Sequence, residues 1–383
     1  MRILVMGCDG YMGWPTCMHF SSKGHEVIGI DNYFKRYTAL ELDCEPIVLN
    51  PNLVERTRIW EGLTGNKIGI YIGDVTDYHF LKSIFIDHKP DVVIHYAEQP
   101  SAPYSMLNRE KAAFTLQNNL ISTLNIAYAV KEVNTQCHII KLGTMGEYGT
   151  PNIDIEEGWF DIEHKGRTEK FLFPRQASSL YHTTKIQDTD MLWYYVRTWG
   201  LRVTDLMQGP VYGIFTDEGK QDSRLMTNFH YDEIFGTVLN RFVVQAVVGH
   251  PLTIYGSGTQ IRGYINIKDS LACVYLSAMH PPEHGKLRIF NQITETFSVN
   301  ELAEKVYAVG KKAGYSVEIK HYDNPRVETE DHYYNPKYTG LMEMGLHPNY
   351  LTDEVVEELL CLVERNKGCI NKNSILRGVK WNK

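Results

Sequence analysis

A glycine-rich turn directly after an apolar segment limits the fold of this chain more than any other feature. Residues 2–6 (RILVM) are followed by Gly7, Gly10 and Gly13, in the spacing GxxGxxG. Glycines at these places allow a tight turn, a close approach of the backbone to a pyrophosphate, and close packing of the next helix. The helix N-terminus adds free N–H groups and a partial positive charge. The strand–turn–helix context favours a dinucleotide site over an ordinary turn.

Short apolar segments alternate with helical ones through the first half of the chain, which is typical of βαβ units. We therefore predict an α/β fold: a doubly wound parallel sheet of the Rossmann type, with a smaller interleaved α/β substrate lobe. Residues 1–208 should form mainly the dinucleotide-binding domain, with return segments near 236–268, and residues 209–383 mainly the substrate lobe. The predicted strands are 2–6, 26–30, 68–72, 91–94, 138–142 and 202–206, and the predicted helices are 112–133 and 181–199.

The second half has a looser pattern. Residues 151–179 are polar and contain short alternating runs, so we expect an ordered excursion with a hairpin, and a loop this long is often functional. Residues 215–231 should form a loop. The remaining predicted elements are a strand at 252–255 and helices at 235–249, 299–313 and 352–366.

Composition excludes several classes of function. Asp plus Glu number 46 against 39 Lys plus Arg, a formal charge of −7, which argues against a nucleic-acid surface. The seven cysteines form no CxxC pair, so neither a disulfide framework nor a zinc site is expected, and no metal is predicted. No apolar run approaches the ~20 residues that span a bilayer. We expect a cytoplasmic protein without a membrane partner.

Asp31 closes the second predicted strand, 18 residues after Gly13. A carboxylate there accepts hydrogen bonds from ribose hydroxyls and repels a 2′-phosphate, which favours NAD over NADP, although nearby Arg36 is a residue type that can accommodate such a phosphate. Asp74 is either an adenine contact or a helix N-cap. The other residues expected around NAD are Asp9, Tyr11, Met12, Asn32, Val75, Tyr96, Ala97, Glu98, Asn118, Leu142, Gln208 and Val211.

Tyr181 and Lys185 have the YxxxK spacing, which places them one turn apart on one face of a helix. A neighbouring ammonium group stabilises a phenolate, so we expect the pKa of Tyr181 to be lowered, and the side chain can then remove a proton from a sugar hydroxyl. Thr144 follows a predicted strand, where this sheet architecture places its ligands, and can hydrogen-bond the reacting hydroxyl. Its alternative role is a local turn hydroxyl.

In this order, the three motifs resemble the extended short-chain dehydrogenases that act on nucleotide sugars. In the 4,6-dehydratases of that group the Thr is followed by an Asp-Glu pair that expels the C6 hydroxyl. Met145 and Gly146 stand in those places here, which counts against a plain dehydratase.

A closer resemblance, over essentially the whole chain, is to the UDP-sulfoquinovose synthases. Plant members of that family carry Arg where this chain has Pro100, an Arg expected to meet substrate or sulfite, so the anion contact on that loop differs here. The similar segments are 98–106 (EQPSAPYSM), 142–156 (LGTMGEYGTPNIDIE), 176–179 (QASS), 235–237 (FGT), 248–255 (VGHPLTIY), 262–264 (RGY) and 324–328 (NPRVE).

The resemblance implies that UDP-glucose and sulfite are joined with the help of bound NAD. Tyr181 would take the C4 hydroxyl proton while hydride leaves C4; water is then lost across C5 and C6, sulfite adds at C6, and the hydride returns. With the Asp-Glu pair missing, Glu147 and His182 are the candidates for moving protons at C5 and C6, with Met145 beside them. The substrate residues so implied are Gln99, Ser101, Thr144, Gln176, Gln208, Phe235, Thr237, Pro251, Leu252, Thr253, Tyr255, Arg262 and Arg326, the two arginines as diphosphate clamps.

Two other functions stay open at this point. One is a UDP-hexose 4-epimerase, since epimerases also lack the Asp-Glu pair. The other is a dinucleotide-binding protein that has lost catalysis, against which the intact Thr144, Tyr181 and Lys185 argue. The sulfur donor is either free sulfite or sulfite delivered by a partner protein, and a homodimer is expected from the resemblance alone.

Overall fold

The computed structural model describes residues 1–324 and 332–375. Seven parallel strands form the central sheet in the order β12-β8-β5-β4-β1-β2-β3. The chain order reverses between β1 and β4, and in sheets of this kind ligands bind outside the carboxyl ends of the strands at that point. The strands are β1 (Arg2–Met6), β2 (Glu26–Asp31), β3 (Ile68–Ile72), β4 (Val92–His95), β5 (His138–Thr144), β8 (Arg202–Gln208) and β12 (Leu287–Gln292).

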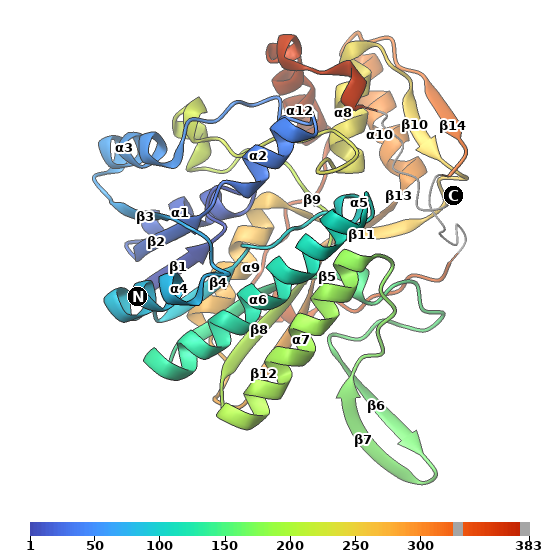
Figure 1. The fold of residues 1–383 in the computed structure, drawn as a ribbon. Helices are drawn as coiled ribbons and strands as arrows, with labels where there is room; N and C mark the ends of the chain where they lie inside the picture. The colour runs from blue at the N-terminus through green and yellow to red at the C-terminus, as the bar shows by residue number, and fades with distance from the viewer. Residues whose placement is uncertain (325–331, 376–383) are drawn as a thin grey trace.

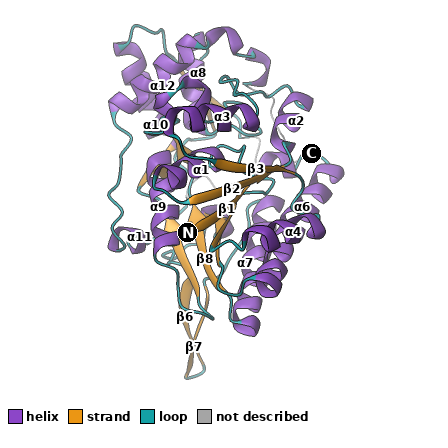
Figure 2. Ribbon diagram, turned by 90° about the vertical axis from the view of Figure 1, so that its left-hand side faces the viewer, coloured by secondary structure: helices purple, strands orange, loops and turns teal. Residues whose placement is uncertain are grey.

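Helices cover both faces of the sheet, as Figure 2 shows. The apolar side chains of both faces are buried, which explains why the inner strands are almost continuously apolar in sequence. One face packs against α1 (Gly13–Ser22), α3 (Leu53–Thr64) and α9 (Ile267–Met279), and the other against α4 (Tyr78–His88), α6 (Arg109–Val133) and α7 (Leu180–Trp199). The predicted doubly wound fold is confirmed.

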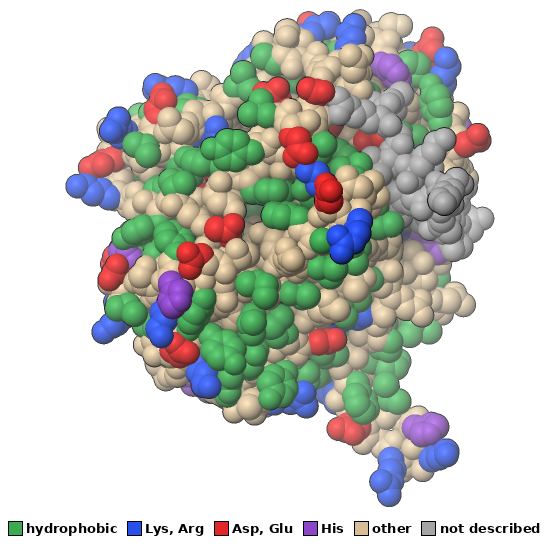
Figure 3. Space-filling view, viewed as in Figure 1, with side chains coloured by type: hydrophobic (Ala, Val, Ile, Leu, Met, Phe, Trp, Pro, Cys, Tyr) green, Lys and Arg blue, Asp and Glu red, His purple; other side chains and the backbone are tan. Residues whose placement is uncertain are grey.

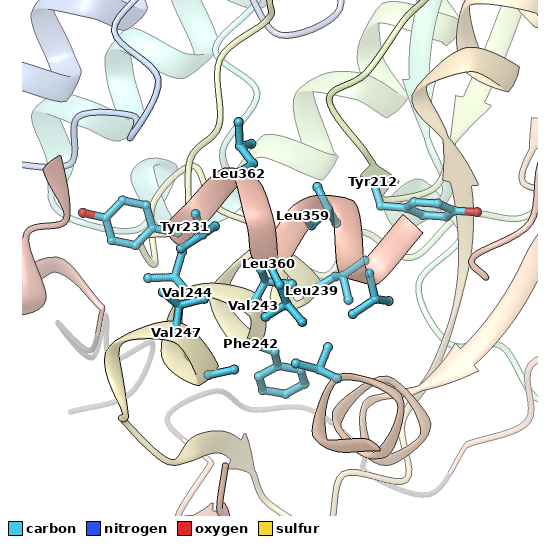
Figure 4. Close-up of a cluster of buried hydrophobic side chains, with 14 of the residues drawn as sticks. Tyr212, Tyr231, Leu239, Phe242, Val243, Val244, Val247, Leu359, Leu360 and Leu362 are labelled. Atoms are coloured by element: carbon cyan, nitrogen blue, oxygen red, sulfur yellow. The ribbon is translucent and has the colours of Figure 1, made fainter. Parts of the chain in front are cut away.

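The second lobe has its own apolar core, in which side chains of α8 (Val238–Val248), α10 (Val299–Lys312) and α12 (Asp353–Arg365) meet (Figure 4). Local signals define these helices: Thr237 caps the N-terminus of α8, and Gly249 ends it in the left-handed conformation, with φ of 70°. The strands of this lobe are β9 (Val211–Tyr212), β10 (Leu252–Tyr255), β11 (Ile261–Asn266), β13 (Glu295–Ser298) and β14 (Ile319–Tyr322). Short helices α2 (Phe34–Glu41), α5 (Ala102–Ser105) and α11 (Gly340–Glu343) complete the described set.

The polar segment 151–179 contains the expected hairpin. Strands β6 (Trp159–His164) and β7 (Arg167–Leu172) pair in antiparallel fashion, and the hairpin projects from the body of the protein (Figures 1 and 3). Lys165 and Gly166 form its turn, both with positive φ. Residues 215–231 contain only two 3₁₀ turns and otherwise no helix or strand, as predicted.

The chain returns to the first domain later than most of the predicted range, although Ile265 and Ile267 at the end of that range pack in the core of the sheet. The return was expected near 236–268, but α8 lies in that range and packs in the second lobe. The returning elements are α9 and β12, and β12 pairs with β8 to become the seventh strand of the sheet. This strand was missed because its six residues, LRIFNQ, end in two polar amides. Within the described residues, no helix has both the length and the apolarity needed to cross a bilayer.

Candidate active site

A cavity of about 750 Å³ lies between the carboxyl ends of the sheet strands and the second lobe. Asp31, Tyr96, Thr144 and Gln208, at or just after the ends of β2, β4, β5 and β8, line its sheet side. Residues of the second lobe such as Arg262 line the other side. The volume is within the range of small-molecule sites, about 300–1,000 Å³.

The glycine-rich turn forms one end of this cavity. Gly7 has φ of 82°, and a β-carbon on it would lie 2.7 Å from the carbonyl carbon of Tyr96. A β-carbon on Gly13 would lie 2.7 Å from the α-carbon of Cys8. Only glycine therefore fits at these two places, and the turn brings Gly10 and the N-terminus of α1 to the cavity wall. This cradle fits the diphosphate of a dinucleotide.

Asp31 lies beside that turn and lines the cavity. Its carboxylate accepts hydrogen bonds from the backbone N–H of Asp9 (2.8 Å) and of Tyr33 (2.7 Å). Burial and the neighbouring Asp9 carboxylate raise the pKa of Asp31 to about 6. The side chain is thus an ionised hydrogen-bond acceptor at neutral pH, as ribose hydroxyls require.

Arg36 and Asp74 lie outside the cavity lining. Arg36 is turned toward Asp9. Asp74 is exposed and accepts hydrogen bonds from Asn32 Nδ2 (3.1 Å) and from the N–H of Thr76 (2.8 Å). It is not the N-cap of α4, a place that Asp77 takes. Neither of its two expected roles is therefore supported. The expected cofactor residues that do line the cavity are Gly7, Asp9, Gly10, Tyr11, Met12, Gly13, Asp31, Asn32, Val75, Tyr96, Ala97, Glu98, Asn118, Leu142, Tyr181, Gln208 and Val211.

Tyr181 lies in the first turn of α7 and lines the cavity, whereas Lys185 is buried one turn further on. The ammonium group of Lys185 forms an ion pair with Glu98 and lies 3.8 Å from Asp188. Burial and the carboxylates of Glu98 and Glu147 raise the pKa of Tyr181 in the protein alone. The expectation that the pKa of Tyr181 is lowered is therefore wrong for the protein alone, because burial has the largest effect and the Glu98 carboxylate, which pairs with Lys185, raises the pKa further.

Thr144 ends β5, and its hydroxyl accepts a hydrogen bond from the N–H of Gly146 (3.2 Å). Glu147 does not line the cavity. Its carboxylate is completely buried, accepts the N–H of Thr144 (3.2 Å), and pairs with Lys141 (3.2 Å) and Arg175 (3.2 Å). Glu147 therefore holds the backbone of Thr144 in position and does not face the cavity.

His182 lines the cavity next to Tyr181, with ring centroids 5.2 Å apart. Its Nδ1 lies 2.7 Å from the hydroxyl of Ser178. The ring covers Gly146 so closely that a β-carbon there would come within 2.6 Å of its Cδ2 and Cε1 atoms. Met145 also lines the cavity, with its side chain packed in the core on the α6–α7 face of the sheet.

The residues expected around the substrate divide into two groups. Ser101, Phe235, Thr237, Tyr255 and Arg262 line the cavity, as do Thr144 and Gln208; Gln99, Gln176, Pro251, Leu252 and Thr253 do not. The amide of Gln99 is buried and holds its own loop through Ser101 and Thr115. Thr253 is buried against Gln245. Arg326 lies outside the described residues.

Two basic residues of the cavity wall were missed by the sequence reasoning. Arg241 is buried in α8 and lies 5.5 Å from the ring of Tyr255. Lys35 lies 5.2 Å from the ring of Phe235, and burial lowers its pKa. Arg241 could have been found from its sequence, since a cation within the otherwise apolar run of α8 needs a buried partner. Nothing in the sequence distinguishes Lys35 from a surface lysine.

A nucleotide cradle, a carboxylate for ribose, and a helix Tyr and a strand-end Thr that line the same cavity together define a dinucleotide-dependent enzyme of sugar nucleotides. The chain belongs to the NAD dependent epimerase/dehydratase family, whose sequence profile matches residues 3–291. The expectation of NAD as cofactor is confirmed at the level of this family.

The chain is similar along its whole length to two proteins named UDP-sulfoquinovose synthase. It is 46% identical to that of Spinacia oleracea over 382 residues, which is 100% of this chain and 79% of the relative. It is 44% identical to that of Sulfolobus acidocaldarius over 388 residues, 100% of this chain and 98% of the relative. The expected resemblance is confirmed. The UDP-glucose 4-epimerase of Bifidobacterium longum, solved with NAD+ and UDP, has the same fold, with TM-score 0.71, 21% identity, and coverage of 97% of this chain and 100% of that one.

Proposed function

We propose that this chain is a UDP-sulfoquinovose synthase that makes UDP-sulfoquinovose from UDP-glucose and sulfite. The observation that carries the proposal is the identity of 46% and 44%, along the whole of this chain, to two proteins of that name. The alternative of a UDP-hexose 4-epimerase has weaker support, since the UDP-glucose 4-epimerase of Drosophila melanogaster is 24% identical over 82% of this chain.

NAD would be held by the glycine-rich turn, by Asp31 and by the N-terminus of α1. When bound, it supplies a reversible hydride acceptor for the sugar carbon. The protein's own contribution begins with Tyr181 and Thr144, which line one stretch of the cavity. Tyr181 would take the proton of the C4 hydroxyl, and Thr144 would hydrogen-bond the same oxygen. Lys185, held by Glu98, sets the electrostatics behind the tyrosine.

For the protons at C5 and C6, His182 has better support than Glu147. The imidazole lines the cavity and titrates near neutral pH when unperturbed. Glu147 is buried between Lys141 and Arg175 and lacks access to the cavity. We therefore assign proton transfer at these carbons to His182, and to Glu147 the positioning of Thr144.

The diphosphate and uridine of the substrate would lie against the second lobe. Among the described residues, Arg262 and Arg241 line this side of the cavity, and guanidinium suits phosphate oxygens. Thr237 and Tyr255 line the same side. The sulfite source, a partner that delivers it, a homodimer and a cytoplasmic location remain predictions.

The test is incubation of the purified protein with UDP-glucose and NAD, with and without sulfite, followed by mass spectrometry. The proposal requires a sulfite-dependent product with a sulfonate in place of the C6 hydroxyl, and a loss of about 10²–10⁴-fold in rate for Tyr181→Phe. UDP-galactose without any sulfonate product would move the chain to the epimerases.

A further inference from the structure

We propose that Asp9 is a second residue that makes this protein select NAD over NADP, because Asp9 holds the guanidinium of Arg36 away from any 2′-phosphate. The inference concerns the cofactor of the family and does not depend on the substrate proposed above. Arg36 follows Asp31 by five residues, the region in which a cation would otherwise accommodate a 2′-phosphate.

Asp9 lies in the glycine-rich turn and is 4% exposed. It accepts two hydrogen bonds from Arg36 in the forked arrangement that carboxylates and guanidinium groups prefer, with Nε to Oδ2 at 2.5 Å and a terminal nitrogen to Oδ1 at 2.8 Å. Its own N–H donates to Asp31 (2.8 Å). Asp9 therefore links the glycine-rich turn to both Asp31 and Arg36 through hydrogen bonds.

The terminal nitrogens of Arg36 also have backbone acceptors. Its two terminal nitrogens donate to the carbonyl oxygens of Asn50 and Pro51, each at 2.8 Å. All three guanidinium nitrogens thus have acceptors, and Arg36 does not line the cavity, although Asp9 and Asp31 do. A 2′-phosphate would need to break this arrangement before it gained a cation.

The charges around Asp9 support the same conclusion. Arg56 is completely buried beneath the turn, 3.4 Å from Asp9, and its guanidinium lies over the ring of Trp14 at 4.4 Å and donates to the carbonyl of Met226. It is therefore a fixed structural partner of Asp9. The charge of Asp9 is thus balanced within the turn, and the cavity wall at the end of β2 presents the carboxylate of Asp31, which repels a dianionic phosphate.

Calorimetric titration of the nucleotide-free protein with NAD and with NADP tests this directly, with no sugar nucleotide present, so its outcome is independent of the proposed reaction. Asp9→Asn removes the charge and one acceptor while keeping the shape of the side chain. We expect the ratio of the NADP and NAD dissociation constants to fall at least about tenfold, and the double variant D9N/R36Q to lose that gain. An unchanged ratio in D9N, or a gain that persists in D9N/R36Q, overturns the proposal.

Arg36→Gln alone keeps the proposal testable if D9N does not fold. If Asp9 already withholds the guanidinium, R36Q leaves the dissociation constant for NADP within about twofold of the wild type. A large further weakening of NADP binding in R36Q would mean that Arg36 reaches the phosphate in the natural protein, which contradicts the proposal. Thermal unfolding of each variant checks that it is folded at the titration temperature.

Discussion

The imidazole ring of His182 lies over the α-carbon of Gly146 and occupies the space that any side chain at residue 146 would need. In the 4,6-dehydratases that the sequence resembles, this residue is one of the acidic pair after the Thr. The two arrangements are mutually exclusive by their sterics. The ring of His182 can therefore occupy this place in the cavity only because residue 146 is a glycine.

Gly146→Ala should reduce formation of the sulfonated product by about tenfold or more, because a β-carbon displaces the ring of His182. In an H182A background the same alanine should cost much less, since the clashing ring is gone. Rates of product formation for the two single variants and the double variant check this. Additive losses would mean that Gly146 matters for a reason other than His182.

Glu147→Gln should lower the free energy of unfolding by about 3–5 kcal/mol, because it leaves Arg175 without its buried counter-charge, while Lys141 keeps its ion pair with Asp205. Urea denaturation measures the change. Glu163→Gln on the exposed hairpin is the matched control and should stay within about 0.5 kcal/mol. A positioning role also predicts that the pH profile of the remaining E147Q activity keeps the shape of the wild-type profile, with both limbs present. Loss of one limb would instead indicate that Glu147 transfers protons.

Glu98→Gln should move the acid limb of the pH profile to lower pH. Burial is the largest cause of the raised pKa of Tyr181, and the Glu98 carboxylate is the next. Without that charge the pKa of Tyr181 falls, and the deprotonated form needed for the oxidation step is populated at lower pH. The rate of hydride transfer, followed from pH 5 to 9 by absorbance, should show the shift, which E163Q should not. A shift to higher pH would show that Glu98 acts through some other group.

Asp31→Asn should stabilise the nucleotide-free protein most above about pH 6. The pKa of Asp31 is raised to about 6 in the folded protein, first by burial and then by Asp9, so the folded state binds this proton more tightly than the unfolded state. The cost of the charge is therefore full above pH 6 and is relieved as the pH falls from there toward the unfolded pKa, ~4. The difference in melting temperature between D31N and wild type should shrink over that range. A difference independent of pH would contradict this.

Local pattern was enough to predict six of the seven strands of the sheet and the glycine-rich turn. Strands β1 and β4 and the glycine turn can be read directly, because buried parallel strands are continuous apolar runs and because Gly7 and Gly13 have no room for a side chain. The YxxxK spacing likewise placed Tyr181 and Lys185 on one helix. The strand β12 escaped because its pairing with β8 is a contact between residues about eighty apart in the chain.

The sequence by itself determined which residue types are available: the glycine cradle, Asp31, Thr144, Tyr181 and His182. Only the tertiary structure decided which of them meet the cavity and with what charge. Glu147 follows Thr144 by three residues, yet its side chain points into the protein and pairs with Lys141. Lys185 forms an ion pair with Glu98, which follows the end of β4. Arg36 forms an ion pair with Asp9. The physical reason is that the pKa and direction of an ionised side chain depend on partners distant in sequence, and local spacing carries no information about them.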